Sequence, residues 1–415
     1  MAQPRPPHRG RPRSGRSAAA ARHRVVALDP PAHAVTVRTP DGETVSMAYD
    51  RLMIGTGATP VRPPIAGLDG LGPADGVHVL HTMGDTFALL RSIEQRKARS
   101  AVIVGAGYIG LEMSEALTAR GLQVTLLEQL DQVMPTIDPE LAEPLAEHLV
   151  ERGVSVHHGT KVRAIAADDG KLGVDTDTDR FHGDIVLVVA GVRPDVQLAA
   201  DAGAALGVRG AIAVDRRMRT TLPDVYAAGD CVHTYHRLLD ADVYLPLGST
   251  AHKQGRVAGI NAVGGDAVFA GSLGTQAVKV FDLVAAGTGL RDDTARTAGF
   301  APLTVAITAD DHKAYYPGAT PIRVRVTGDR RSGRLLGAQL LGSHGAEIAK
   351  RIDIFATAIS YGAAVHDIEH LDLSYTPPLG SPWDAVQIAA TAWTRTAHMM
   401  MERAADTRRP RAKVT

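Results

Sequence analysis

The chain has 415 residues, enough for two or three domains, and 45% of them are hydrophobic, as expected of a folded globular protein. Forty-five basic residues balance 45 acidic ones, so the overall charge gives no reason to expect binding to nucleic acid or to an anionic membrane. The single cysteine excludes an internal disulfide, no Cys–His spacing suggests a zinc site, and a reducing cytoplasm is the expected location.

Residues 1–24 differ in composition from the rest of the chain. They contain seven arginines and no acidic residue. Such a segment cannot build a core, so we expect a disordered leader, with a transit peptide or a nucleic-acid-binding arm as alternatives. The longest apolar run, residues 184–192, is too short to cross a bilayer, and no membrane span is expected.

Short strands separated by turns are predicted from Val25 onward. The sequence PDGE at 40–43 marks a hairpin, because Asp-Gly supplies the positive φ angles of a tight turn. The strand in RLMIGTGATP, residues 51–60, runs into Gly55 and Gly57. By itself this pattern indicates only a turn at the end of a strand.

The segment AVIVGAGYIGLEMSEALTARGLQVTLLE, residues 101–128, predicts a nucleotide-binding unit. A strand ends at Val104, Gly105, Gly107 and Gly110 form G-x-G-x-x-G, and a helix follows. These glycines allow a tight turn, close approach of a pyrophosphate and close packing of helix on strand. Glu128 ends the next strand, where its carboxylate can accept hydrogen bonds from ribose hydroxyls and repel a 2′-phosphate. The unit therefore favours NADH over NADPH.

A further helix is predicted after this unit, with Asp138 as its N-cap, Pro139 at its first position and Gly153 after its end. His157 and His158 are neighbours on a strand and point to opposite faces, so they do not suggest a metal site. From residue 274 longer strands and one amphipathic helix predict a separate domain without a phosphate-binding loop. Packing against a second copy is its expected role.

The motifs together resemble the flavin- and pyridine-nucleotide-dependent disulfide reductases, specifically the group of coenzyme A-disulfide reductases, NADH oxidases and NADH peroxidases. The resemblance rests on YDRLMIGTGATP, GAGYIGLE, AGVRPD, LPDVYAAGDC, LGSTAHKQGR, KVFDL, HKAYYPG, GAQLLG and LDLSYTPP, which occur in the order typical of the family. It implies an α/β fold with two Rossmann-like nucleotide-binding domains and a C-terminal α+β dimerisation domain.

The resemblance also implies domain limits. We expect an FAD-binding domain in two segments, 25–97 and 214–270, incomplete at its N-terminus, around an inserted NAD(H)-binding domain at 98–213. The dimerisation domain is expected at 271–395. Residues 1–24 and 396–415 are expected to be the leader and a tail.

The site residues follow from the same resemblance. Asp230 is expected to bind the ribitol chain of FAD, Tyr108 to cover the flavin until nicotinamide displaces it, and residues 248–253 to line the flavin ring. Tyr375, accompanied by Tyr316, is expected to reach the partner's active site, although both tyrosines are equally well explained as interface packing. The remaining residues expected to bind a cofactor are Gly105, Gly107, Ile109, Gly110, Glu112, Glu128, Gly191, Thr56, Gly57, Gly229, Gly248, Ser249, Thr250, Ala251 and Lys253.

The sequence departs from the family pattern at its start. Before Val25 there is no strand, no second G-x-G-x-x-G for FAD and no active-site cysteine. Cys231 follows the AAGD motif, where the family commonly has a small residue or a cysteine, and we expect it to be a packed neutral thiol without a redox role.

We therefore expect a cytoplasmic, homodimeric flavoenzyme that moves hydride from NADH to FAD. Without a working cysteine, the electrons would pass to an outside small-molecule acceptor such as oxygen or a quinone. One alternative is a truncated or mis-started gene product with little activity. The other is a non-enzymatic NAD(H)-binding dimer that acts as a sensor.

Overall fold

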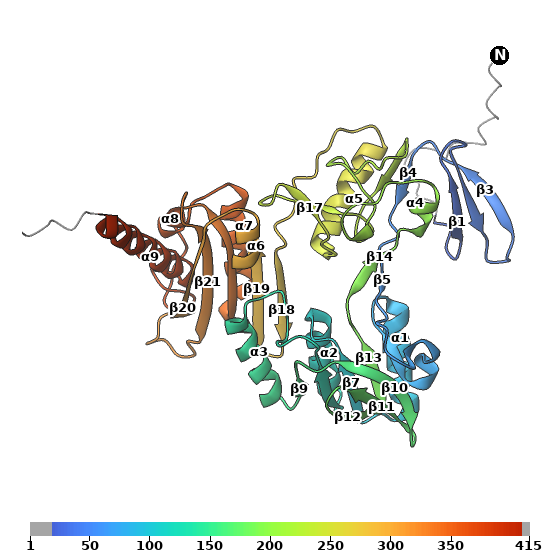
Figure 1. Ribbon diagram of the computed structural model, residues 1–415, viewed down its shortest axis with the longest axis horizontal. Coiled ribbons are helices and arrows are strands. Elements are labelled where there is room, and N and C mark those ends of the chain that lie inside the picture. The colour runs from blue at the N-terminus through green and yellow to red at the C-terminus, as the bar shows by residue number, and fades with distance from the viewer. Residues whose placement is uncertain (1–18, 409–415) are drawn as a thin grey trace, which may run out of the picture.

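The computed structural model describes residues 19–408, in three lobes that Figure 1 shows around an open centre. Residues 1–18 and 409–415, which contain most of the expected leader and the last part of the expected tail, lie outside the described residues. The mixed α/β architecture agrees with the predicted fold class.

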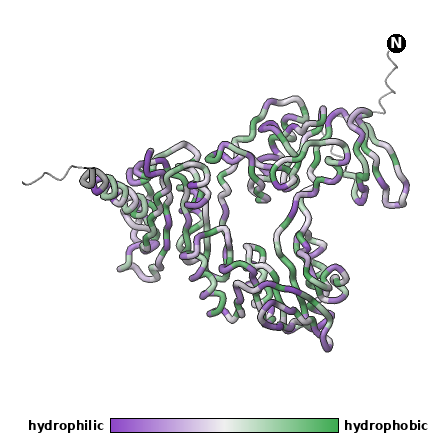
Figure 2. Tube along the Cα trace, in the orientation of Figure 1, coloured by the Kyte–Doolittle hydropathy of each residue, from purple (hydrophilic) through white to green (hydrophobic). Residues whose placement is uncertain are grey.

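The first lobe is a parallel sheet with helices, and it contains the G-x-G-x-x-G turn. Its five strands have the order β6-β13-β7-β8-β9. Figure 2 shows hydrophobic stretches of the chain within this lobe. Three antiparallel strands form a small second sheet beside it. The elements are β6 (Val77–Val79), α1 (Met83–Arg96), β7 (Ser100–Val104), α2 (Tyr108–Ala119), β8 (Gln123–Leu127), α3 (Pro139–Glu151), β9 (Ser155–His157), β10 (Val162–Asp168), β11 (Lys171–Thr176), β12 (Arg180–Gly183) and β13 (Ile185–Val188).

Both expected limits of this nucleotide lobe, 98 and 213, are corrected by the structure. Strand β6 pairs in parallel with β13, so Val77–Val79 belong to the nucleotide sheet, and the helix α1 that follows packs against β6 in the same lobe. After β13 the chain leaves the lobe, and Ala199 and Ile212 pack with Leu28 and Val35 of another lobe. The correction has a physical reason: short strands acquire their sheet through long-range pairing, which local sequence does not reveal.

The second lobe combines segments from both sides of the nucleotide lobe. Strands β4 (Leu52–Ile54) and β15 (Val225–Ala227) pair in parallel, with α5 (Gly248–Ala262) packed on them. The antiparallel pair β5 (Ala58–Pro60) and β14 (Val192–Pro194) connects this lobe to the nucleotide lobe (Figure 1). The other elements are β1 (Arg24–Asp29), β2 (Ala34–Arg38), β3 (Thr44–Ala48), α4 (Gln197–Asp201), β16 (Thr234–His236) and β17 (Ala241–Val243). The predicted hairpin lies between β2 and β3, with Gly42 at φ 85°.

The third lobe is a five-stranded antiparallel sheet with strand order β18-β19-β22-β21-β20. Neighbouring residues on one strand point to opposite faces, so Leu340 packs in the lobe's own core with helices α7 and α9, whereas Leu341 packs with the nucleotide lobe. The elements are β18 (Gln276–Val280), β19 (Leu283–Gly289), α6 (Asp292–Thr297), β20 (Pro302–Asp310), β21 (Pro321–Asp329), β22 (Leu335–Ser343), α7 (Ile348–Ser360), α8 (Val365–Glu369) and α9 (Ala385–Arg408).

Helix α9 continues past the end expected for this lobe. It runs to Arg408 because no glycine or proline interrupts residues 385–408. The tail expected from residue 396 therefore begins inside a helix.

Candidate active site

The nucleotide-binding turn lies between β7 and α2 and has the geometry that its glycines predict. Gly105 has φ 110°, and a Cβ atom there would lie 2.7 Å from the Val189 carbonyl oxygen. A Cβ at Gly110 would lie 2.0 Å from the Gly105 oxygen, so helix and strand pack too closely for any side chain. Around Gly107, which precedes the first residue of α2, the space is open. The free amides of the first helical turn thus have room for a pyrophosphate.

Glu128 directly follows β8 and is tied to this turn. Its Oε2 atom accepts the Ala106 N–H at 2.7 Å, and its Oε1 atom accepts the Leu130 N–H at 2.9 Å. The side chain is buried. Because each carboxylate oxygen can accept two hydrogen bonds, both retain capacity for ribose hydroxyls. The glycines and Glu128 therefore make this turn suitable for binding a dinucleotide.

A second cluster forms around Asp230, in the loop after β15. Gly229 has φ 89° and donates its N–H to Gln254 Oε1 at 3.1 Å, while Tyr244 Oη donates to the Asp230 carbonyl at 3.0 Å. Burial raises the pKa of the Asp230 carboxyl, and nearby His81 partly opposes this shift. Asp230 and Gly229 belong to the AAGD motif and Gln254 to LGSTAHKQGR, although Gln254 was not predicted as a site residue, whereas Tyr244 lies in none of the quoted motifs.

Tyr108 connects the two clusters. Burial raises the pKa of its phenol, and the charge of Asp230, followed by that of Glu112, raises it further. Tyr108 and Asp230 therefore lie close enough to interact, although they come from different lobes and are 122 positions apart in the sequence. The phenol stays protonated at neutral pH.

A cavity of about 1220 Å³ opens beside Tyr108 and the N-terminus of α5. It is also lined by residues of the third lobe, including Lys350 on α7. The expected cofactor-binding residues that line it are Tyr108, Gly248, Ser249, Thr250 and Lys253. Ala251 does not line it, because this residue faces Gly229, whose added Cβ would lie 3.8 Å from the Ala251 Cβ.

Three glycines, Gly57, Gly191 and Gly229, leave backbone surface that no side chain of their own covers. Gly57 and Gly191 have φ angles of 72° and 97°, and nothing lies within 4 Å of a Cβ built on either one. Thr56, beside Gly57, donates its hydroxyl to the Asp195 carbonyl at 2.5 Å. Together with Gly229, these positions fit the flavin end of FAD, since a planar ring needs open backbone surface.

Cys231 lies in the core beneath these loops. It is fully buried, and its Sγ atom donates to the Ala228 carbonyl at 3.3 Å. Burial raises the pKa of its thiol, an effect that hydrogen bonds with Gly57 and Thr56 only partly oppose. A buried thiol of raised pKa is a poor nucleophile, so the predicted packed neutral thiol is confirmed.

Tyr375 and Tyr316 lie on the third lobe and do not line the cavity. Both are partly exposed, and slight desolvation followed by a hydrogen bond with Tyr315 raises the pKa of Tyr375. Within a single chain the structure therefore does not bring these two tyrosines to the other site residues.

Comparison with known proteins identifies the family. Residues 11–255 match the pyridine nucleotide-disulphide oxidoreductase family, and residues 275–385 match the dimerisation domain of the same family. The chain belongs to this family. It is therefore an oxidoreductase, which favours the enzyme over the two alternatives raised by the sequence.

Individual relatives agree with this family. The chain is 35% identical over 351 residues to an NAD(P)H sulfur oxidoreductase (CoA-dependent) of Pyrococcus furiosus, covering 84% of this chain and 78% of that protein. Its fold matches an NAD-dependent persulfide reductase of A. fulgidus with a TM-score of 0.85 and 36% identity, over 92% and 69% of the two chains. It also matches a water-forming NADH oxidase of Lactobacillus brevis bound to NADH, with a TM-score of 0.85 and 26% identity, over 91% and 83%.

Two further observations concern the part of the chain that the structure describes. None of its helices is long and apolar enough to cross a membrane. No group of three or more His, Cys, Asp or Glu side chains in residues 19–408 is arranged to hold a metal ion.

Proposed function

We propose that this oxidoreductase transfers hydride from NADH to FAD and passes the electrons to a small-molecule acceptor outside the chain. The observation that carries the proposal is the shared cavity, which Tyr108, the first residue of the nucleotide-binding helix, lines together with Gly248 and Lys253 of α5. The electrostatic effect of Asp230, the last residue of the AAGD motif, on Tyr108 supports placing the predicted NADH site beside the predicted flavin site. When bound, the flavin supplies the redox chemistry, taking up a hydride and giving up two electrons.

In this mechanism, the residues of the chain bind the two cofactors and orient them. The turn of Gly105, Gly107 and Gly110 holds the NADH pyrophosphate, and Glu128 selects the ribose. Asp230 and the α5 N-terminus hold the flavin, and the helix amides favour negative charge on the reduced ring. Tyr108 is a protonated, partly exposed ring. It would lie between the two cofactors and would exclude water until the nicotinamide takes its place.

The acceptor in this proposal is a small molecule such as oxygen or a quinone. Cys231 is the only thiol of the sequence, and its burial and raised pKa argue against a thiol-exchange step on this chain. The relatives named for sulfur or persulfide substrates are similar to this chain in sequence and fold, and the proposal does not extend their substrates to this chain.

We further propose that the enzyme is a homodimer. The third lobe, which matches the dimerisation domain, exposes several large apolar side chains, including Tyr315, Leu379 and Trp383. Burying such side chains against a partner is favourable. In such a dimer, Tyr375 and Tyr316 are the residues proposed to reach the partner's flavin.

A flavin titration of the Asp230→Ala variant tests the flavin site. The fluorescence of added FAD should be quenched on binding to the wild type, and the variant should bind FAD about tenfold more weakly because it lacks a ligand carboxylate. Asp240→Asn is the control, since Asp240 accepts from Tyr235 Oη at 2.7 Å on the surface of the same lobe. Equal FAD affinity in Asp230→Ala and wild type would remove Asp230 from the site.

A further inference from the structure

The loop between β8 and α3 holds the nucleotide-binding turn from one side. Met134, buried in this loop, donates its N–H to the Ala106 carbonyl at 2.8 Å. Ala106 is the second residue of the turn, and its own N–H is bound by Glu128. Both polar backbone groups of Ala106 are thus fixed, so the position of this loop determines where the turn lies.

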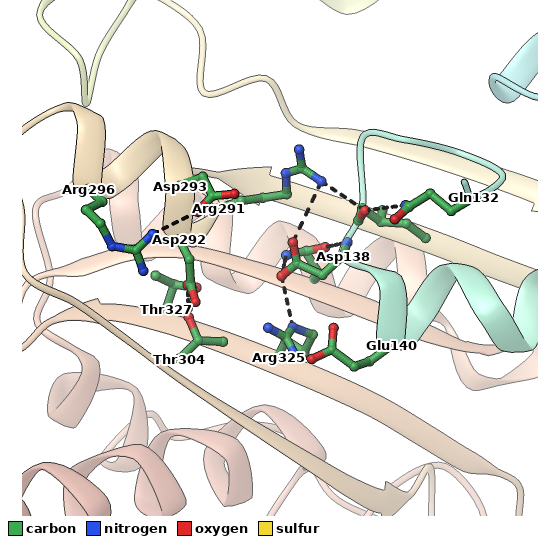
Figure 3. A network of polar contacts seen from close by, with 12 residues as sticks. Gln132, Asp138, Glu140, Arg291, Asp292, Asp293, Arg296, Thr304, Arg325 and Thr327 are labelled. Atoms are coloured by element: carbon green, nitrogen blue, oxygen red, sulfur yellow. Dashed lines mark hydrogen bonds and ion pairs between the residues drawn. The ribbon is translucent and has the colours of Figure 1, made fainter. Parts of the chain in front are cut away.

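The other end of the same loop is bound by the third lobe. Asp138 Oδ2 accepts from Arg325 Nε at 2.9 Å and from Gln339 Nε2 at 2.7 Å, and the Asp138 N–H donates to Gln339 Oε1 at 2.6 Å. Arg291 donates to the Ile137 carbonyl at 2.9 Å (Figure 3). The loop is therefore bound at Met134 to the turn and at residues 137–138 to the C-terminal sheet.

The contacts of Asp138 are buried, which makes them specific. Asp138 is 9% exposed and Gln339 is 4% exposed. A buried carboxylate is costly unless its partners are in place, so this pairing fixes one relative position of loop and sheet. The partners lie on the neighbouring strands β21 and β22, away from the edges of the sheet.

The side chain of Asp138 also does not cap its own helix. Asp138 is the N-cap residue of α3, yet its side chain makes no capping hydrogen bond to that helix. An N-cap aspartate ordinarily accepts a backbone N–H of the first helical turn. Here Arg325 and Gln339 of another lobe take both the carboxylate and the backbone amide, so the contact between the lobes replaces the cap.

We propose that Asp138 is a positioning residue for NADH binding, which links the rigid C-terminal sheet through residues 134–138 to the nucleotide-binding turn. The inference rests on the proposed function in taking NADH as the ligand. It adds that the affinity for NADH depends on residues of the dimerisation domain, which do not touch the nucleotide.

The test measures NADH binding to Asp138→Asn by the change in NADH fluorescence, with steady-state kinetics alongside. The variant keeps the side-chain size and one acceptor oxygen for Arg325 and Gln339, but it loses the charge and places an N–H2 donor at the Oδ1 position, which lies 3.7 Å from Arg291 Nη1. We expect about tenfold weaker NADH binding and a matching rise in KM, with kcat changed less than about twofold, since a displaced turn affects binding more than chemistry. Gln339→Met, of similar volume and without either hydrogen bond, should give the same pattern.

Asp282→Asn is the matched control. Asp282 Oδ1 accepts from Arg152 Nη2 at 2.5 Å and lies 2.7 Å from His148 Nε2, so it binds the far end of α3 to the same lobe. This control should lower the unfolding temperature and leave NADH affinity within about twofold of wild type. NADH affinity that is unchanged in Asp138→Asn and Gln339→Met, or lowered equally in Asp282→Asn, would overturn the inference. A wild type that does not bind NADH at all would instead contradict the proposed function.

Discussion

At the scale of single residues, the proposed function assigns a packing role to the buried thiol of Cys231. Cys231→Ser should leave NADH oxidation intact and lower the free energy of unfolding by about 1 kcal/mol, because burying a hydroxyl in this core costs more than burying a thiol, even with the Ala228 carbonyl as a partner. The checks are steady-state kinetics and chemical denaturation. Disulfide reduction by the wild type that disappears in Cys231→Ser would refute a packing role.

The proposed function assigns the choice between NADH and NADPH to Glu128. Wild type should bind NADH more tightly than NADPH, and Glu128→Ala should lose about tenfold in NADH affinity while narrowing the difference between the two cofactors. The ratio of NADH affinity to NADPH affinity is the informative quantity. The variant also leaves the Ala106 amide without its partner, which should lower the affinity of the turn for both nucleotides. Glu147→Ala, exposed on α3, serves as the control. Equal wild-type affinity for NADH and NADPH would refute the assignment.

At the scale of elements, strand β6 contains a buried histidine, His78, which we expect to make the nucleotide lobe less stable in acid. His78 is 2% exposed, and burial, followed by the charge of Arg96, lowers its pKa from 6.5 to about 4 despite an opposing effect of Asp85. The unfolded chain takes up a proton near pH 6.5 and the folded chain only near pH 4, so His78 should reduce the free energy of unfolding progressively as pH falls through this range.

Comparing wild type with His78→Phe by denaturation across that pH range isolates this effect from the carboxylates, which titrate in both proteins. The wild type should lose more stability than the variant between pH 6.5 and about 4. Parallel pH profiles for the two proteins would show that His78 is not buried as a neutral base.

The elements also show what the sequence could predict. Gly105, Gly107, Gly110 and Glu128 form one strand–turn–helix–strand segment, so local spacing was sufficient to identify the turn. Asp138 was correctly predicted as the N-cap residue of α3. Its side chain, however, binds Arg325 and Gln339, about 190 and 200 positions later in the sequence. Likewise, no local pattern predicts the electrostatic effect of Asp230 on Tyr108, because the two residues belong to different lobes.

At the scale of the whole molecule, the third lobe should hold two copies together. Light scattering at micromolar concentration should give the mass of a dimer, because the exposed aromatic surface of this lobe needs a partner. Tyr375→Ala should then lower kcat clearly, with only a small decrease in the free energy of unfolding. A clean monomer with full activity would remove Tyr375 and Tyr316 from the active site.

The central claim is that NADH reduces a flavin where the lobes of Tyr108 and Asp230 meet, without help from a thiol. The most direct measurement is the visible absorbance of the flavin-loaded protein during anaerobic titration with NADH. We predict that NADH bleaches the flavin absorbance equally in wild type and Cys231→Ser, and that air restores it. NADH binding that leaves the flavin absorbance unchanged would contradict the account.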